Sequence, residues 1–359
     1  MKSIIYLKGS EINDVRLQKF LRYFTKRKAD VTFWGWSRLR EKKEMDGVKS
    51  EYLLSGGGYG KRSKLFFYYF MWTFVVFWKC IKTDLHDKIL IAIDFDSALP
   101  VYWASKIKKI HYIYEVYDDF ALRYKFPTVI KKAIHKLDTK VMRGSQSVIH
   151  VDANRVTYKD CKWIVIENSP IDIFSGKERN YDEIDYKFAV IGHLSKERGL
   201  SPILKFAKCN SQVKFLVVGR FIDEEDRKAF RSLANVEYYD YMLQNDLFQK
   251  MGKCCSIFSL YDPSLEINRL AASNKVYDAM MFGIPVITNK EVINSGFIKE
   301  QRIGFVIDYD YNETWDCLLS DFFMDDVRDL GSNGRKLFLN KYQFEELVNQ
   351  RLMPILNEI

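Results

Sequence analysis

Residues 273–287 combine a cation, an acid and a tight turn at a spacing that suits a sugar joined to a diphosphate. Lys275 and Asp278 are three positions apart, so they share one face near the start of a predicted helix. A helix start gathers unpaired N–H groups and partial positive charge, and an ammonium group there strengthens the attraction for phosphate. The carboxylate can accept hydrogen bonds from sugar hydroxyls. The competing interpretation is an ordinary amphipathic helix before the buried strand predicted at 286–288.

This segment resembles the donor-site motif of the family 4 glycosyltransferases, a run of the form Lys-hydrophobic-x-Glu-Ala/Tyr-Met-Ala-x-Gly-x-Pro-Val-Ile. The resemblance implies that Asn274, Lys275 and Asp278 bind the donor, with Asp278 at the position where the family usually has Glu. The family pattern pairs this acid with a Glu eight residues earlier. That position is Leu270 here, so the first acid is either absent or moved to Glu266.

A second cationic segment begins at Gly192, directly after a predicted strand at 188–191. It resembles the family element Gly-Arg-Leu-x-x-x-Lys-Gly, in which both cations meet the donor diphosphate. Arg198 holds the Lys position, and its guanidinium fork can bind two phosphate oxygens. His193 replaces the usual Arg and carries less charge at neutral pH unless phosphate raises its pKa. The alternative is a polar turn before a helix that starts at Leu200.

The resemblance extends to other parts of the second half. The strand predicted at 214–218 ends in Gly219 and Arg220, where the family places the donor. Tyr241 and Met242 occupy the region in which the base is usually contacted through backbone groups. We therefore expect these four residues to belong to the donor site.

In the first half, the resemblance implies an acceptor site at strand ends. Strand ends in parallel sheets face the ligand crevice, so Asp118 is the first choice for orienting the acceptor. Asp94 and Asp96 form an Asp-x-Asp sequence, which is typical of metal-binding motifs, but they lie in the half of the chain that lacks the donor segments. A strand-end or acceptor role is the preferred interpretation for them, and no metal site is predicted. The other residues assigned to acceptor binding are Gly9, Ser10 and Asp119.

Glycosyl transfer breaks the bond between an anomeric carbon and a diphosphate, so negative charge grows on the leaving group. Fixed cations aimed at that charge lower the barrier. Arg198 and Lys275 suit this role, and with them neither a catalytic metal nor a cofactor is expected. By resemblance, the reaction retains anomeric configuration, and the donor phosphate itself takes the acceptor proton. Such a mechanism needs no nucleophile from the enzyme.

Charge is distributed unevenly along the chain. Residues 1–172 contain 32 Lys and Arg against 19 Asp and Glu, while the remainder contains 24 against 28. The basic half implies an anionic partner such as a membrane surface, a phosphorylated acceptor or nucleic acid. No nucleic-acid motif is present, so we expect no nucleic-acid partner. The six cysteines form no Cys-x-x-Cys pair, which favours free thiols in a reducing compartment.

Residues 65–78 form an uncharged aromatic run, LFFYYFMWTFVVFW. The run is shorter than the roughly 20 apolar residues that a spanning helix needs. Two interpretations are about equally supported: a buried domain helix, and a helix that also enters the bilayer interface with nearby lysines toward lipid phosphates. A transmembrane span is the least favoured alternative.

Alternating strands and helices predict an α/β protein with two doubly wound, Rossmann-like domains. The resemblance to the family implies that the two domains form a GT-B fold and face each other across a cleft. The expected domains are an acceptor-binding domain at 1–172 and a donor-binding domain at 180–339, joined by a polar linker at 175–185. By resemblance, a C-terminal helix at 340–359 packs back on the first domain. The predicted strands are 3–7, 31–34, 89–93, 111–115, 147–151, 163–166, 188–191, 214–218, 236–239, 256–260, 286–288 and 304–307.

The sequence therefore predicts a retaining glycosyltransferase of capsule or exopolysaccharide type. It would move a hexose-type sugar from a UDP- or GDP-sugar to a lipid-linked or oligosaccharide acceptor. The expected location is cytoplasmic, peripheral on the inner face of the cell membrane, held at its anionic surface by the basic half. The alternative function is a non-catalytic module that binds a nucleotide sugar or a polyanionic glycan.

The glycine-rich loop at 55–62 resembles a Walker A motif but lacks its first Gly and its Ser/Thr.

Overall fold

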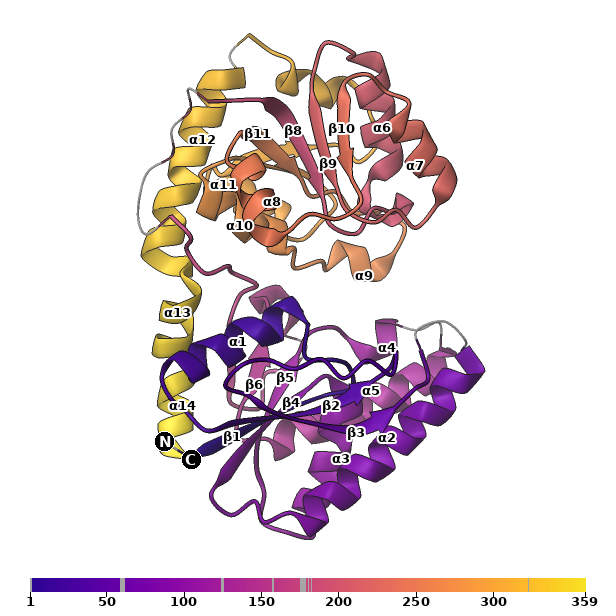
Figure 1. Ribbon diagram of the computed structural model, residues 1–359, viewed down its shortest axis with the longest axis vertical. Helices are drawn as coiled ribbons and strands as arrows, with labels where there is room; N and C mark the ends of the chain where they lie inside the picture. Colours follow the sequence, from indigo (N-terminus) through magenta and orange to yellow (C-terminus); the bar gives the residue numbers. More distant parts are fainter. Residues whose placement is uncertain are drawn as a thin grey trace. The chain divides into compact units, whose positions relative to one another are not determined.

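The computed structural model describes residues 2–58, 62–123, 126–156, 158–174, 179, 181, 183–321 and 323–359. The chain forms two compact units, Met1–Glu167 with Glu345–Ile359, and Asn168–Phe344 (Figure 1). Residues 59–61 of the glycine-rich loop lie outside the described part, as do 175–178, 180 and 182 of the expected linker. Each unit is built on one parallel sheet.

The first unit contains a seven-stranded parallel sheet in the order β3-β2-β1-β4-β5-β6-β7. The order reverses direction between β1 and β4, as in doubly wound folds. The third strand of the sheet was not predicted, because its half-exposed sequence KSEYLLS has neither a buried run nor clean alternation. The strands are β1 Ser3–Lys8, β2 Val31–Ser37, β3 Lys49–Ser55, β4 Lys88–Ile93, β5 His111–Val116, β6 Val148–His150 and β7 Trp163–Val165.

Helices cover both faces of this sheet because successive side chains of each strand point to opposite sides. Ile5 and Leu7 pack in one cluster with residues of α2, α3 and α5. Tyr6, between them, meets Phe20 and Phe24 of α1. The helices of the first unit are α1 Val15–Lys26, α2 Arg62–Lys82, α3 Phe95–Ser105, α4 Phe120–Arg123 and α5 Thr128–Gly144, with a 3-10 turn at Ala153–Arg155.

The C-terminal segment belongs to the first unit from Glu345 onward. Arg351 donates to the Glu167 carboxylate at 2.8 Å, and Tyr23 of α1 hydrogen-bonds Asn349. Lys2 donates to the carbonyl of Ile359 at 2.8 Å. The helical stretch comprises η4 Phe338–Tyr342, α13 Phe344–Leu347, η5 Val348–Leu352 and α14 Met353–Glu358, with π-helical geometry in η4 and η5.

The second unit contains a six-stranded parallel sheet in the order β10-β9-β8-β11-β12-β13, which reverses direction between β8 and β11. Its strands are β8 Tyr186–Ile191, β9 Phe215–Val218, β10 Val236–Tyr239, β11 Cys254–Phe258, β12 Val286–Asn289 and β13 Gly304–Ile307. Its helices are α6 Leu200–Cys209, α7 Glu224–Arg231, α8 Gln244–Met251, α9 Glu266–Arg269, α10 Asn274–Phe282, α11 Ser295–Glu300 and α12 Phe323–Leu337, with 3-10 turns η2 Lys196–Arg198 and η3 Glu313–Leu318.

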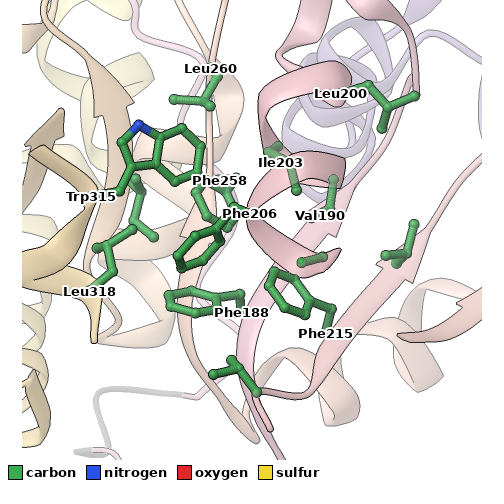
Figure 2. Packing of buried hydrophobic residues seen from close by; sticks show 14 of the residues in the cluster. Phe188, Val190, Leu200, Ile203, Phe206, Phe215, Phe258, Leu260, Trp315 and Leu318 are labelled. Carbon is green, nitrogen blue, oxygen red and sulfur yellow. The ribbon is translucent and has the colours of Figure 1, made fainter. Parts of the chain in front are cut away.

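Aromatic packing fills one face of the second sheet. Phe188 of β8 lies among Phe206, Phe215 and Phe258, with ring centroids 5.3–5.4 Å apart, and Trp315 closes the cluster (Figure 2). Large rings in such contact contribute strongly to a core. A separate cluster on the other face includes α10, whose residues 279–282 are fully or almost fully buried. The expectation of two doubly wound Rossmann-like sheets is confirmed.

Candidate functional sites

The second unit places its two predicted cations at the point where its strand order reverses. Ligands of open α/β sheets bind outside the carboxyl ends of the strands at such a point. Arg198 follows β8, and Tyr261 follows β11, the neighbouring strand across the reversal. The guanidinium carbon of Arg198 lies 4.4 Å from the centre of the Tyr261 ring. Lys275 lies in the first turn of α10, which follows α9 along the chain.

Backbone contacts hold Arg198 in place. The backbone of Tyr261, whose ring supports the guanidinium, exchanges two hydrogen bonds with the Asn289 side chain, at 2.9 and 3.1 Å. Gly199 has a φ of +75°, and a Cβ there would lie 2.4 Å from the Cβ of Leu260. The loop can therefore approach β11 this closely only with glycine at position 199.

Two glycines bring the loops after β8 and β9 together. Gly219 has a φ of +144°, and a Cβ added to it would lie 1.9 Å from the carbonyl oxygen of Gly192. The amide of Gly192 donates to Val218 at 2.8 Å, and the amide of Leu194 donates to Arg220 at 3.2 Å. The two strand ends thus present exposed backbone side by side, as close approach to a ligand requires.

Lys275 carries an electrostatic signature of a binding site. Burial and, to a smaller extent, the positive charge of Arg198 together lower the pKa of its ammonium group to about 8, while Asp278 opposes the shift. Within the part of the chain that the structure describes, neither Arg198 nor Lys275 forms an ion pair with a carboxylate. Two neighbouring cations that lack such a partner suit a ligand with more than one negative charge.

Hydrogen bonds also fix the start of α10. The Ser273 side chain caps the helix by accepting from the amide of Lys275 at 3.3 Å. Ser259, which follows β11, donates to the Ser273 hydroxyl at 2.8 Å. The position of Lys275 is therefore tied to the end of β11, the same strand end that carries Tyr261.

The remaining residues predicted for the donor site differ in exposure. The side chains of His193, Arg220 and Asn274 are exposed, and Tyr241 is 78% exposed. Met242 instead packs against the cluster that contains α10, and Asp278 is half-buried. Of the two positions considered for the first acid, Leu270 ends α9 and Glu266 begins it with an exposed side chain.

The first unit has a polar cavity of about 320 Å³ at its own point of strand reversal, between β1 and β4. Residues that follow β1, β4 and β5 line it, which is where the ligand rule for parallel sheets places a site. The lining includes two residues predicted for the acceptor site after β1 and the first-choice acid after β5. Its members are Lys8, Gly9, Ser10, Glu11, Asn13, Asp14, Arg38, Asp94, Asp96, Tyr117 and Asp118.

Asp94 stores backbone strain at this cavity. Its φ and ψ are 62° and 161°, a combination that is almost exclusive to glycine. The surroundings hold it there: its side chain accepts from the amides of Tyr117 and Asp118 at 3.0 and 3.4 Å. Gly9 lies opposite, and a Cβ there would lie 2.3 Å from a carboxylate oxygen of Asp96. Strain maintained in this way is typical of functional positions.

The two neighbouring acids after β5 have different surroundings. Asp118 lines the cavity and pairs with Arg155 at 3.3 Å while 44% of its side chain stays exposed. Asp119 is turned to its own backbone, where it caps α4 by accepting from the amides of Ala121 and Leu122 at 2.8 and 3.2 Å. Asp119 is absent from the cavity lining.

Sequence reasoning missed several residues that shape these sites. Tyr261 belongs to no recognisable motif, and an aromatic residue after a strand is usually part of the core, so the sequence does not indicate a site there. Lys8 at the end of β1 matches no motif, although it pairs with Asp14 at 2.7 Å and lies 4.1 Å from the Tyr117 ring centre. Arg38 follows β2 and donates a hydrogen bond to the Gly9 carbonyl at 2.7 Å. This contact requires β2 to lie beside β1 in the sheet, and the spacing of residues in the sequence does not reveal the order of the strands.

No family model and no curated protein matches the chain. Solved structures do match along its whole length. Sucrose-phosphate synthase from Thermosynechococcus elongatus superposes with a TM-score of 0.74 at 12% identity, covering 100% of this chain and 98% of the other. HepE from Anabaena, in complex with UDP and glucose, gives a TM-score of 0.74 at 14% identity with both chains covered completely.

WaaG, a glycosyltransferase involved in lipopolysaccharide biosynthesis, gives a TM-score of 0.65 at 10% identity, with 97% of this chain and 98% of the other covered. At sequence identities this low, the structural similarity is evidence for a shared fold. Together with the two doubly wound sheets, it shows that this chain has the GT-B fold.

Proposed function

We propose that this protein is a retaining glycosyltransferase that uses a nucleotide-diphosphate sugar. The observation that carries the proposal is the pair Arg198 and Lys275 at the strand reversal of the second unit, neighbouring and without a carboxylate ion pair among the described residues. The pyrophosphate of the donor would bind between them. Both cations would then stabilise the charge that the diphosphate gains as the sugar leaves.

The remaining donor contacts follow from the same arrangement. The exposed backbone at Gly192, with open space at its Cβ position, gives the diphosphate and ribose room to approach. His193, Arg220, Asn274 and Asp278 would bind the phosphates and sugar hydroxyls, and the backbone near Tyr241 and Met242 would contact the base. Because the leaving phosphate can take the acceptor proton, no metal and no enzymic nucleophile enter the mechanism. The transferred sugar would be of hexose type.

The nucleotide is proposed as uridine diphosphate. HepE of Anabaena was solved with UDP and with UDP-glucose, and it shares the fold of this chain end to end. A GDP-sugar is the second choice. A thermal-shift series of the full chain with UDP, GDP, ADP and CDP tests this directly, since a ligand that binds only the folded state raises its stability. Stabilisation by none of the four would contradict the proposal.

The acceptor would bind in the cavity of the first unit. Carboxylates there can accept hydrogen bonds from sugar hydroxyls, and Asp118 would orient the attacking one. Gly9 and Ser10 form the opposite wall. We propose a lipid-linked or oligosaccharide acceptor in cell-surface polysaccharide synthesis, and a location at the inner face of the cell membrane. The basic first half and its aromatic helix support that location.

One prediction concerns pH. In the free enzyme, the pKa of Lys275 near 8 means that its charge is lost as pH rises through 8. Affinity for UDP is therefore expected to fall above pH 8 in wild type. In Lys275→Arg the cation stays charged, so the decline should disappear. Calorimetric titrations between pH 6.5 and 9.5 measure this; a parallel decline in both proteins would assign the pH effect to another group.

A second prediction separates the two acids after β5. Asp118→Asn is expected to lower kcat/KM for the acceptor by about tenfold to a hundredfold, because a hydrogen bond to a charged group is lost. Asp119→Ala should instead lower the free energy of unfolding by about 0.5–2 kcal/mol through loss of a helix cap, with acceptor kinetics unchanged. Steady-state kinetics and urea unfolding of both variants distinguish the acceptor role from the helix-capping role. An exchange of the two phenotypes would move the acceptor role to Asp119.

The second candidate function is a binding module without catalysis. Leu270 favours it, because this apolar residue stands where the resembled family has its first acid. Binding of a nucleotide sugar with neither transfer nor hydrolysis, across neutral, phosphorylated and lipid-linked acceptors, would favour this function over the enzyme.

A further inference from the structure

The outer side of α2 exposes a row of aromatic side chains. Its inner side is ordinary core, since Trp72, Val76 and Cys80 are completely buried. The outer residues follow one another at four-residue spacing, which puts them on one helical face. They are between 43% and 75% exposed, and a soluble surface rarely leaves so much adjacent apolar area uncovered. These residues are Phe66, Phe70, Phe74 and Trp78, with Phe67 beside them.

An apolar groove continues this surface onto α3. It has a volume of about 490 Å³ and lies between Phe70, Phe74 and Phe77 of α2 and Trp103 and Ile107 at the end of α3. Trp103 and Ile107 are 42% and 71% exposed. Lys106 stands at the edge of the groove, with its ammonium group 4.8 Å from the centre of the Tyr102 ring.

Positive charge surrounds the aromatic surface. Among residues whose side chains the structure describes, the stretches 65–82, 95–109 and 128–144 contain ten Lys and Arg against two acids. One of the acids, Asp96, lines the cavity of the first unit, and the other, Asp138, accepts a hydrogen bond from Tyr114 at 2.8 Å. The three helices pack on the same core cluster and so cover one face of the sheet (Figure 1). α5 adds an exposed row of lysines, Lys132, Lys136 and Lys140.

We propose that the outer face of α2, α3 and α5 binds the surface of an anionic lipid bilayer without spanning it. Aromatic rings fit the headgroup region, and ammonium groups at the same depth pair with lipid phosphates. α2 is long and apolar enough to cross a membrane by length and composition, but its inner residues are packed on the sheet. The proposed function includes a location at the membrane, and this face is the surface by which the protein would bind there. Membrane binding by this face does not depend on whether the protein is catalytic.

Sedimentation of the full chain with vesicles tests this surface. Vesicles of phosphatidylcholine mixed with phosphatidylglycerol are compared with pure phosphatidylcholine, because basic segments are attracted to anionic lipid. Wild type is expected to bind the anionic vesicles. The variant Phe66→Ser, Phe70→Ser, Phe74→Ser should lose about tenfold in partitioning. The variant Lys132→Glu, Lys136→Glu, Lys140→Glu should lose about a hundredfold.

A charge-matched control comes from the second unit, where Lys208, Lys214 and Lys228 are also exposed. Their triple Glu variant should bind vesicles as wild type does. All variants should keep the thermal shift with UDP, so a failure of the membrane surface and a failure of the proposed donor site are distinguishable. If the wild-type protein does not sediment with anionic vesicles, the proposal is overturned. So would a dimer in light scattering that the aromatic variant dissociates, because a second copy would then cover this face.

Discussion

Replacing Lys275 with methionine, or Arg198 with alanine, is expected to slow glycosyl transfer by about a hundredfold to a thousandfold each. The reason is that both cations would act on charge that develops only as the diphosphate leaves. Initial rates of sugar transfer from the donor identified by thermal shift measure the effect. Lys299→Met, an exposed lysine at the end of α11, is the matched control and should retain full activity.

Stability distinguishes this loss from unfolding. The pKa of Lys275 lies below its ordinary value of 10.5, so its charged form is disfavoured in the folded protein. Lys275→Met should therefore raise the free energy of unfolding, fully below pH 8 and progressively less as pH rises toward 10.5. An inactive variant with increased stability is the signature of a functional cation. Wild-type transfer rates in both Lys275→Met and Arg198→Ala would remove the proposed mechanism.

Gly219→Ala is expected to cost about 2–5 kcal/mol of unfolding free energy and to abolish the thermal shift with nucleotide. The new methyl group would lie 1.9 Å from the Gly192 carbonyl, and a φ of +144° is strained for alanine. The loops after β8 and β9 would have to separate, which removes the exposed backbone proposed for the donor. Urea unfolding, with and without nucleotide, measures both effects.

Gly296→Ala is the control for this substitution. It lies in α11 with nothing within 4 Å of its Cβ position and no positive φ. Alanine favours a helix over glycine, so stability should stay equal or rise by up to about 1 kcal/mol. If Gly219→Ala behaved like Gly296→Ala, the close approach of the two loops would not matter for folding or binding.

The strand pattern could be predicted from sequence where strands are buried on both faces. β1, β4 and β12 are short runs of β-branched and apolar residues, and they occur where the sequence predicts them. β3 escaped prediction because an edge strand satisfies fewer packing constraints. The start of α3 at Phe95 could not be predicted, because it directly follows Asp94, a strained residue whose conformation no propensity describes. Such positions are set by tertiary contacts.

The candidate sites divide in the same way. Lys275 and Arg198 could be singled out because their local segments resemble a known motif. Tyr261 could not, since its stacking on Arg198 depends on β8 and β11 being neighbours across the reversal of strand order. Composition predicted the aromatic character of α2 but not which of its sides is exposed. Only packing in the core, where Trp72 stacks on Trp36 of β2 with ring centroids 6.0 Å apart, separates Trp72 from the exposed Phe70.

The central claim is that the second unit binds a pyrophosphate between Arg198 and Lys275. A crystal structure of the full chain soaked with uridine diphosphate tests it most directly. We expect phosphate oxygens within hydrogen-bond distance of both side chains, at the carboxyl ends of β8 and β11. A nucleotide bound in the cavity of the first unit, or in the second unit with both cations turned away from it, would show that the two cations do not bind the pyrophosphate.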